Sequence, residues 1–204
     1  MAGNREFFNR RLHSLLGVIP IGVFLTQHLV VNHFVTGGPD SFEKAAAFMG
    51  NLPFRIVLET VIIYLPMLFH AIYGLYIVFT AKSNVKNFGF FRNWLYLIQR
   101  ITGVITLIFI AWHVWQTRVA DALGTADVSY EMMHNILSSP VMFVFYLVGI
   151  LSAIFHFANG LWSFLVSWGI TVSPRSQVIS TYVTIGIFVI LSIVGIQTLI
   201  AFVS

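Results

Sequence analysis

The chain has 204 residues, of which 58% are hydrophobic and only 9% are charged, and its formal net charge is +4. This composition provides too little polar surface for a water-soluble domain of that length, so it predicts an all-α integral membrane protein. Because the chain contains no cysteine, disulfides, thiolate metal sites and cysteine-bound iron–sulfur clusters are excluded, and histidine is the only strong nitrogen ligand.

Five apolar runs are long enough to cross the roughly 30 Å hydrocarbon core of a bilayer as helices. They predict one domain over residues 1–204, a helical bundle with spans at about 12–34, 56–81, 94–119, 140–168 and 177–203. Glycine, proline and polar residues separate the runs. The basic start of the chain leads into an apolar run without a small-residue cleavage site, so we expect the first helix to be retained.

Basic residues are concentrated on one side of the predicted bundle. The side of the N-terminus carries Arg5, Arg10, Arg11, Lys82, Lys86, Arg92 and Arg175, with Arg100 a little way into the third span. The other side has only Lys44, Arg55 and Arg118, accompanied by most of the acids. By the positive-inside rule we expect a cytoplasmic N-terminus and an external C-terminus. The basic face suits a soluble partner of complementary charge, whereas nucleic acid is not an expected partner.

Four histidines lie inside four of the predicted spans, namely His28, His70, His113 and His156. Counted from the cytoplasmic helix ends, His28 and His113 lie at about 24–27 Å, whereas His70 and His156 lie at about 16–18 Å. An outer pair and an inner pair are therefore expected roughly 10 Å apart along the membrane normal. Haem iron takes axial imidazoles from facing helices, so we interpret the pairs as two stacked sites for haem iron.

Small residues share helical faces with these histidines, as a flat macrocycle between helices requires. Helical projection at about 100° per residue places Gly17 near the face of His28, and Gly74 near that of His70. Other small residues project near the remaining two histidines: Thr102, Thr106, Gly149, Ser152 and Gly160. Small residues are also enriched wherever membrane helices pack, so the depth match of the histidines carries more of the interpretation.

The other three histidines have weaker patterns. His13 lies at the inner interface, where it would meet a propionate of the inner haem together with Arg10 or Arg11. An interfacial histidine that orients the first helix is an equally good interpretation. His33 projects away from the pair and His134 falls in a polar loop, so both are interpreted as surface residues without a role in a site.

Glu59 is the only acid inside a predicted span. It lies eleven residues before His70, which projects it within about 20° of the same helical face, near the outer end of the second span. A carboxyl there would exchange protons with a quinone beside the outer haem. The alternative is an acid favoured by the helix N-terminus and paired with Arg55.

Several segments of the chain are familiar: RRLHSLLGVIP, QHLVVNHF, LPMLFHAIYGLY, FRNWLYLIQRITG with the later WHVW, and IFHFANGLW. Over essentially its whole length, the chain resembles the cytochrome b membrane subunit of succinate dehydrogenase from Gram-positive bacteria, which is related to fumarate reductase cytochrome b. The resemblance implies a dihaem anchor in the bacterial cytoplasmic membrane, with a flavoprotein subunit and an iron–sulfur subunit on its cytoplasmic face.

The resemblance also implies a path for electrons and a set of ligands. Electrons from succinate would pass through flavin, iron–sulfur clusters, the inner haem b and then the outer haem b to menaquinone. The family's axial ligands fall on His70 and His156 for the inner haem. For the outer haem they fall on His28 and His113.

Three other functions remain open from the residues alone. A dihaem cytochrome b of another quinone-linked dehydrogenase or hydrogenase is separated only by the resemblance, because the histidine spacing does not identify the electron donor. A histidine-relay transporter would need broken helices or repeats, and beyond Pro66 the sequence gives little sign of them. A haem-free structural anchor would use its histidines only for helix contacts.

Overall fold

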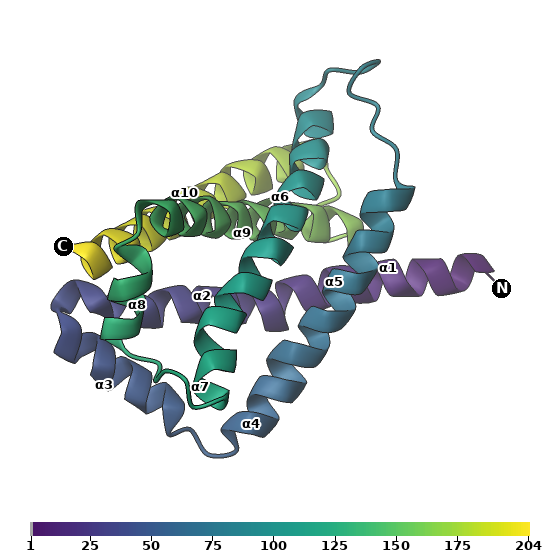
Figure 1. Cartoon of the computed structure of the whole chain (residues 1–204). Coiled ribbons are helices and arrows are strands. Elements are labelled where there is room, and N and C mark those ends of the chain that lie inside the picture. The colour runs from purple at the N-terminus through teal and green to yellow at the C-terminus, as the bar shows by residue number, and fades with distance from the viewer. Residues whose placement is uncertain (1) are drawn as a thin grey trace.

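The computed structural model describes residues 2–204, and its regular structure over that range is helical (Figure 1). Five helical segments have the length and hydropathy to cross a membrane: Gly3–Gly37, Arg55–Thr80, Phe91–Ala122, Pro140–Ser167 and Pro174–Val203. Each overlaps one predicted span. The structure therefore confirms the all-α fold class and the number of spans.

The first span consists of α1 (Ala2–Val18), α2 (Pro20–His33) and the 3₁₀ turn η1 (Phe34–Gly37). Ile19 joins the first two with helical dihedrals, and its amide bonds to the carbonyl of Leu15 at 2.9 Å. Pro20 follows directly and has no amide hydrogen to donate, which locally interrupts the ladder without ending the helix.

The second and third spans each contain a π-helical stretch. The second comprises α4 (Arg55–Leu58), η2 (Glu59–Tyr64) and α5 (Leu65–Thr80), and the third comprises α6 (Phe91–Val114), η3 (Trp115–Val119) and α7 (Ala120–Ala122). In the second, Pro66 has no backbone N–H, so a carbonyl of the preceding turn lacks its usual helical hydrogen bond. In the third, the Thr117 hydroxyl donates to the His113 carbonyl at 2.7 Å and competes with the backbone. Both stretches change the helical phase.

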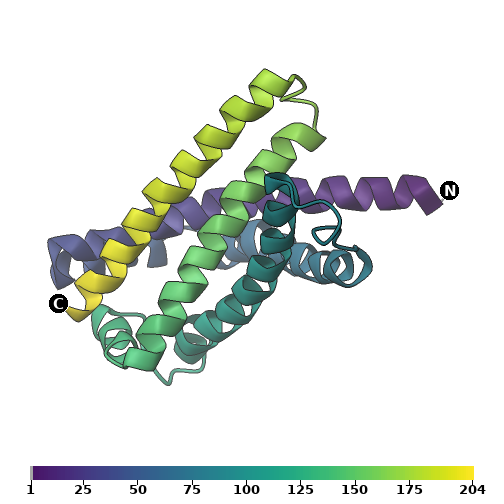
Figure 2. The ribbon, with the colours of Figure 1, turned by 90° about the horizontal axis from the view of Figure 1, so that it is seen from above.

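The fourth and fifth spans, α9 (Pro140–Ser167) and α10 (Pro174–Val203), pack side by side (Figure 2). A reciprocal capping box between Ser173 and Ser176 starts α10. Leu29 of α2 meets Ile154 of α9 and Leu191 of α10 in a buried cluster. Since α6 also packs on α9, α9 is the central helix of the bundle.

Two helices in the connections were not expected from the sequence. These are α3 (Pro39–Gly50) and α8 (Tyr130–Leu137), which lie at the end of the bundle that holds the C-terminus (Figure 1). The Phe42 ring meets the Phe202 ring edge-on at 5.1 Å. The second buried cluster joins both helices to the spans: Val35, Phe42, Phe109, Met133, Leu137, Tyr146, Leu199 and Phe202.

The interpretation of His33 and His134 as surface residues is wrong, because the covered end of the bundle half-buries both. His33 Nδ1 lies 3.2 Å from Thr198 Oγ1 and links α2 to α10. His134 Nδ1 lies 2.7 Å from the Phe202 carbonyl oxygen, to which Nδ1–H donates. The last carbonyls of a helix have no partner within it, so His134 caps the end of α10.

Candidate functional site: two pairs of histidines

The four histidines of the spans form two close pairs. The ring centroids of His28 on α2 and His113 on α6 are 5.9 Å apart, with 74° between the ring planes. The ring centroids of His70 on α5 and His156 on α9 are 6.1 Å apart, with 89° between the planes. The structure confirms the predicted pairing of the imidazoles, while their role as haem ligands stays a prediction.

The two pairs are farther apart than the sequence suggested. On α6, Gly103 lies opposite His156, and His113 follows ten positions later, about 15 Å along the helix. On α9, Tyr146 contacts His113 at 5.6 Å between centroids, and it precedes His156 by the same interval. The expected separation of roughly 10 Å is too small, because it assumed regular helices that begin at one common depth.

Backbone carbonyls hold both imidazoles of the inner pair. His70 Nδ1 lies 2.9 Å from the His13 carbonyl oxygen, and His156 Nδ1 lies 3.0 Å from that of Gln99. The side-chain Nε2 of Gln99 donates to the backbone carbonyl of His156 at 2.9 Å, and the side-chain Nδ2 of Asn159 donates to Gln99 Oε1 at 2.8 Å. When Nδ1–H donates to a carbonyl, Nε2 presents its lone pair, as in histidines that bind metals.

The outer pair is held by side chains instead. His113 Nδ1 lies 3.3 Å from the hydroxyl of Tyr146, a residue only 1% exposed, and that hydroxyl donates to Gln116 Oε1 at 3.3 Å. The Asn32 amide donates to the His28 carbonyl at 2.8 Å and lies 3.4 Å from His28 Nε2. Sequence reasoning missed Tyr146, because its partners lie 33 and 30 residues away along the chain.

Glycines let neighbouring helices approach the inner imidazoles. A Cβ atom added to Gly17 would lie 2.5 Å from His70 Cε1, and one added to Gly103 would lie 2.9 Å from His156 Cε1. The expectation that Gly17 lies beside His28 is wrong. The two residues share a helical face, but eleven positions separate them by about 16 Å along the helix, so Gly17 lies at the depth of the inner pair.

His13 lies against the inner pair. Its ring is stacked on that of His70, with 4.0 Å between centroids and 9° between planes. A Cβ atom on Gly74 would come 3.2 Å from His13 Nε2, so this glycine, which shares a helical face with His70 as projected, accommodates the His13 ring. His13 thus supports His70 through its ring and its carbonyl; its contact with a propionate stays a prediction.

Arg10 and Arg11 have other partners in the structure. Arg10 Nη2 forms an exposed ion pair with Glu6 Oε1 at 2.8 Å. The Arg11 guanidinium lies 5.0 Å from the ring centroid of Phe7 and 5.4 Å from that of Trp168. Their predicted role at a propionate is untested, and these contacts give it no support.

Glu59 joins the outer ends of the second and third spans. Its carboxylate lies 3.2 Å from Arg118 Nη2 and 3.7 Å from Arg55 Nε, while Arg118 also pairs with Asp121 at 2.8 Å. The predicted alternative partner Arg55 is therefore present, and Arg118 was missed. The projection onto the face of His70 assumed regular helix, whereas the π-helical stretch begins at Glu59 itself.

The residues present fit a metal-bearing macrocycle with two axial imidazoles. Within residues 2–204, no three His, Cys, Asp or Glu side chains gather to hold a metal ion. A metal at either pair would therefore need further ligands from a cofactor. If two imidazoles each formed a metal–nitrogen bond of about 2 Å to one metal, their ring centroids would be about 6 Å apart. The centroid distances in the two pairs, 5.9 and 6.1 Å, agree with this separation. The porphyrin of haem supplies the remaining nitrogens.

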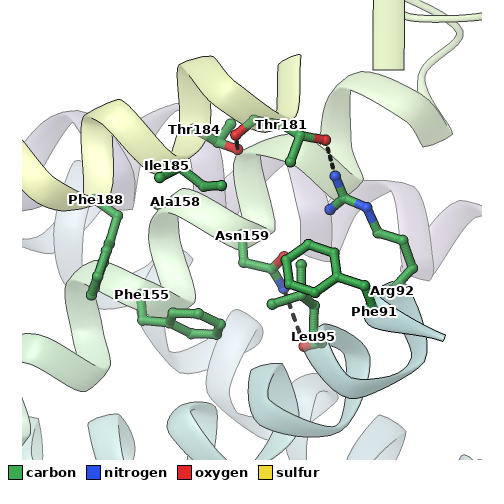
Figure 3. A pocket seen from close by; sticks show the side chains of 10 residues that line it. All are labelled: Phe91, Arg92, Leu95, Phe155, Ala158, Asn159, Thr181, Thr184, Ile185 and Phe188. Atoms are coloured by element: carbon green, nitrogen blue, oxygen red, sulfur yellow. Dashed lines mark hydrogen bonds between the residues drawn. The ribbon is translucent and has the colours of Figure 1, made fainter. Parts of the chain in front are cut away.

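A small cavity of about 60 Å³ between α6, α9 and α10 is a separate feature (Figure 3). Arg92 borders it, with its guanidinium 3.5 Å from the Trp162 ring centroid and a hydrogen bond to the Thr181 hydroxyl. Asn159 also lines this space and points its amide at the Leu95 carbonyl. None of the four paired histidines lines the cavity, so we assign it to helix packing.

The fold and the paired imidazoles define a multi-pass membrane protein built around two candidate cofactor sites. Residues 87–195 match the family described as succinate dehydrogenase/fumarate reductase transmembrane subunit. The chain is also 63% identical, over 203 residues and 100% of both chains, to the succinate dehydrogenase cytochrome b558 subunit of Bacillus subtilis (strain 168). The chain belongs to the succinate dehydrogenase/fumarate reductase transmembrane subunit family. Membership confirms the resemblance and disfavours the transporter and the hydrogenase-linked cytochrome.

Proposed function

We propose that this chain anchors succinate dehydrogenase in the bacterial cytoplasmic membrane and passes electrons from the iron–sulfur subunit through two haem b groups to menaquinone. The observation that carries the proposal is the pair of facing imidazoles at two levels, with centroids 5.9 and 6.1 Å apart. The B. subtilis relative is named a cytochrome b558 subunit, which supports haem b as the group at these sites.

His70 and His156 would hold the inner haem, and His28 and His113 the outer one. When bound, each haem supplies a one-electron carrier whose potential depends on axial ligands and their hydrogen bonds. The carbonyls of His13 and Gln99 fix the tautomers of the inner ligands, and Tyr146 does the same for His113. The apolar spans keep water away from both levels.

The basic end of the molecule is the proposed docking face. The N-terminus and the segment joining α5 to α6 lie at one end of the bundle, and α3, α8 and the C-terminus lie at the other (Figure 1). Because the first end carries most of the basic residues, we place it in the cytoplasm. The iron–sulfur and flavoprotein subunits would dock there, nearest the inner pair.

Glu59 is the proposed proton-exchanging group for menaquinone at the outer end. Its side chain is 21% exposed and lies between two guanidinium groups at the junction of two π-helical stretches. Such stretches occur frequently at functional sites. A carboxylate there can accept a proton when quinol is oxidised and return one when quinone is reduced.

The assignment of the four ligands is tested by substituting one histidine of each pair. His156→Ala should remove one of two haem components from the optical and EPR spectra of the complex, and His113→Ala should remove the other. His134→Ala is the control, because this residue caps α10 away from both pairs. Retention of both components in either variant of a paired histidine would contradict the proposal.

A further inference from the structure

Arg100 of α6 carries a charge that its surroundings leave incompletely satisfied. Its Nη2 donates to the Val78 carbonyl, while its Nε is buried without a hydrogen-bond partner. Within residues 2–204, no carboxylate forms an ion pair with Arg100. An unpaired charge inside a membrane span is costly, and such residues usually have a functional partner.

Arg100 lies next to the residues that hold the inner pair. It follows Gln99, which is hydrogen-bonded to His156, and precedes Gly103, which faces the same ring. At about 100° per residue, the Arg100 side chain is turned about 60° around α6 from Gly103. Its hydrogen bond to the Val78 carbonyl shows that this side of α6 faces α5. The guanidinium therefore lies at the edge of the space between α5, α6 and α9.

The guanidinium lies on the side of the inner pair that faces away from the outer pair. Its partner Val78 comes eight residues after His70 on α5, about 12 Å farther toward the N-terminal end of the bundle. Side chains of a helix lean toward its N-terminus, which carries Arg100 in the same direction.

The Arg100 guanidinium is a positively charged hydrogen-bond donor, so an anionic acceptor would satisfy it. Haem carries two carboxylates along one edge of its ring. The basic residues first expected to meet them are engaged elsewhere, Arg10 with Glu6 and Arg11 with Trp168. Arg100 also has an aromatic neighbour, with its guanidinium 5.7 Å from the Tyr96 ring centroid. Of the three arginines, only Arg100 has a side-chain nitrogen that is buried without a hydrogen-bond partner.

We propose that Arg100 binds a carboxylate of the haem held by His70 and His156. This inference rests on the proposed function. Arg100 would thereby direct the carboxylate edge toward the cytoplasmic end and favour reduction at the inner site. A unit charge about 12 Å away, at an effective dielectric constant of about 20, changes a reduction equilibrium about tenfold, or about 59 mV for one electron.

The test is a redox titration of the assembled complex in membranes, with the inner component identified by its loss in His156→Ala. Arg100→Gln should lower the reduction equilibrium constant of the inner component about tenfold and change that of the more distant outer component less. Arg100→Lys should retain most of the effect, because it keeps the charge. Arg5→Gln removes an exposed charge at the same end and should leave both components unchanged.

The outcomes separate this inference from the proposed function. Two haems with an unchanged inner potential in Arg100→Gln would overturn the role of Arg100 alone, whereas a wild-type complex without haem would overturn the proposed function. If Arg100→Gln loses the inner haem, the wild-type chain is reconstituted with haem and with haem dimethyl ester. Weaker inner-site binding of the ester supports the inference, and equal binding overturns it.

Discussion

The imidazole ring of His13 lies flat on that of His70, with 4.0 Å between centroids, while the His13 carbonyl accepts a hydrogen bond from the same residue. One residue of the first span thus restrains the ring plane and the tautomer of a proposed ligand on the second. The ring contact can be removed by mutation, whereas the carbonyl remains with any side chain.

His13→Ala should therefore shift the EPR signal of the inner haem without abolishing haem binding. His13→Phe keeps a flat ring against His70, so its shift should be smaller. Low-temperature EPR of both variants provides the comparison. Equal shifts in the two variants, or none in either, would show that the stacked ring does not constrain the ligand.

Gly17→Ala and Gly103→Ala should each displace an inner imidazole, because the added Cβ atoms would approach His70 and His156 to 2.5 and 2.9 Å. Overpacking of this kind typically costs about 1–3 kcal/mol, so we expect reduced inner-haem occupancy. Gly186→Ala is the matched control, since nothing lies within 4 Å of a Cβ atom there. Haem occupancy of purified complexes decides the matter; occupancy equal to the control would refute the close approach.

Tyr146→Phe should raise the reduction potential of the outer haem. The substitution removes the acceptor of His113 Nδ1–H, and without it the imidazole is a less basic ligand. Tyr182→Phe serves as the control, because Tyr182 is 71% exposed. A redox titration in which Tyr146→Phe leaves the outer midpoint at its wild-type value would contradict this account of the tautomer.

Glu59→Gln should slow quinone turnover while the haem content stays intact, because an amide cannot exchange the proton. Steady-state oxidation of succinate with a menaquinone analogue, alongside haem content, measures both. Glu6→Gln, at the opposite end of the bundle, is the control. If Glu59 only braces two helices through its ion pair, Arg118→Gln will slow turnover equally, and unchanged turnover in Glu59→Gln removes it from the mechanism.

Much of the fold was predictable because hydropathy, helix length and alternating direction are local properties of the sequence. They place His70 with His156 and His28 with His113 without any tertiary information. Helix α3 was missed although Gly38, Pro39 and Asp40 form a recognisable helix start. Its apolar side packs on α10, which sequence spacing alone does not reveal.

The remaining differences come from geometry that ideal helices omit. Counting on a regular helix puts Glu59 on the face of His70, but the π-helical stretch before Pro66 shifts the phase. Angular projection also ignores depth, which is why Gly17 was assigned to the wrong histidine. Contacts such as Tyr146 with His113 join distant parts of the chain and become visible only when the helices are assembled.

The most direct test of the two-site account is the amount of haem per polypeptide, from pyridine haemochrome absorbance against protein concentration. Chain that is folded and produced under haem-replete conditions should contain two b haems. No haem under those conditions would contradict the electron-transfer function, and a single haem would contradict the assignment of both histidine pairs as cofactor sites.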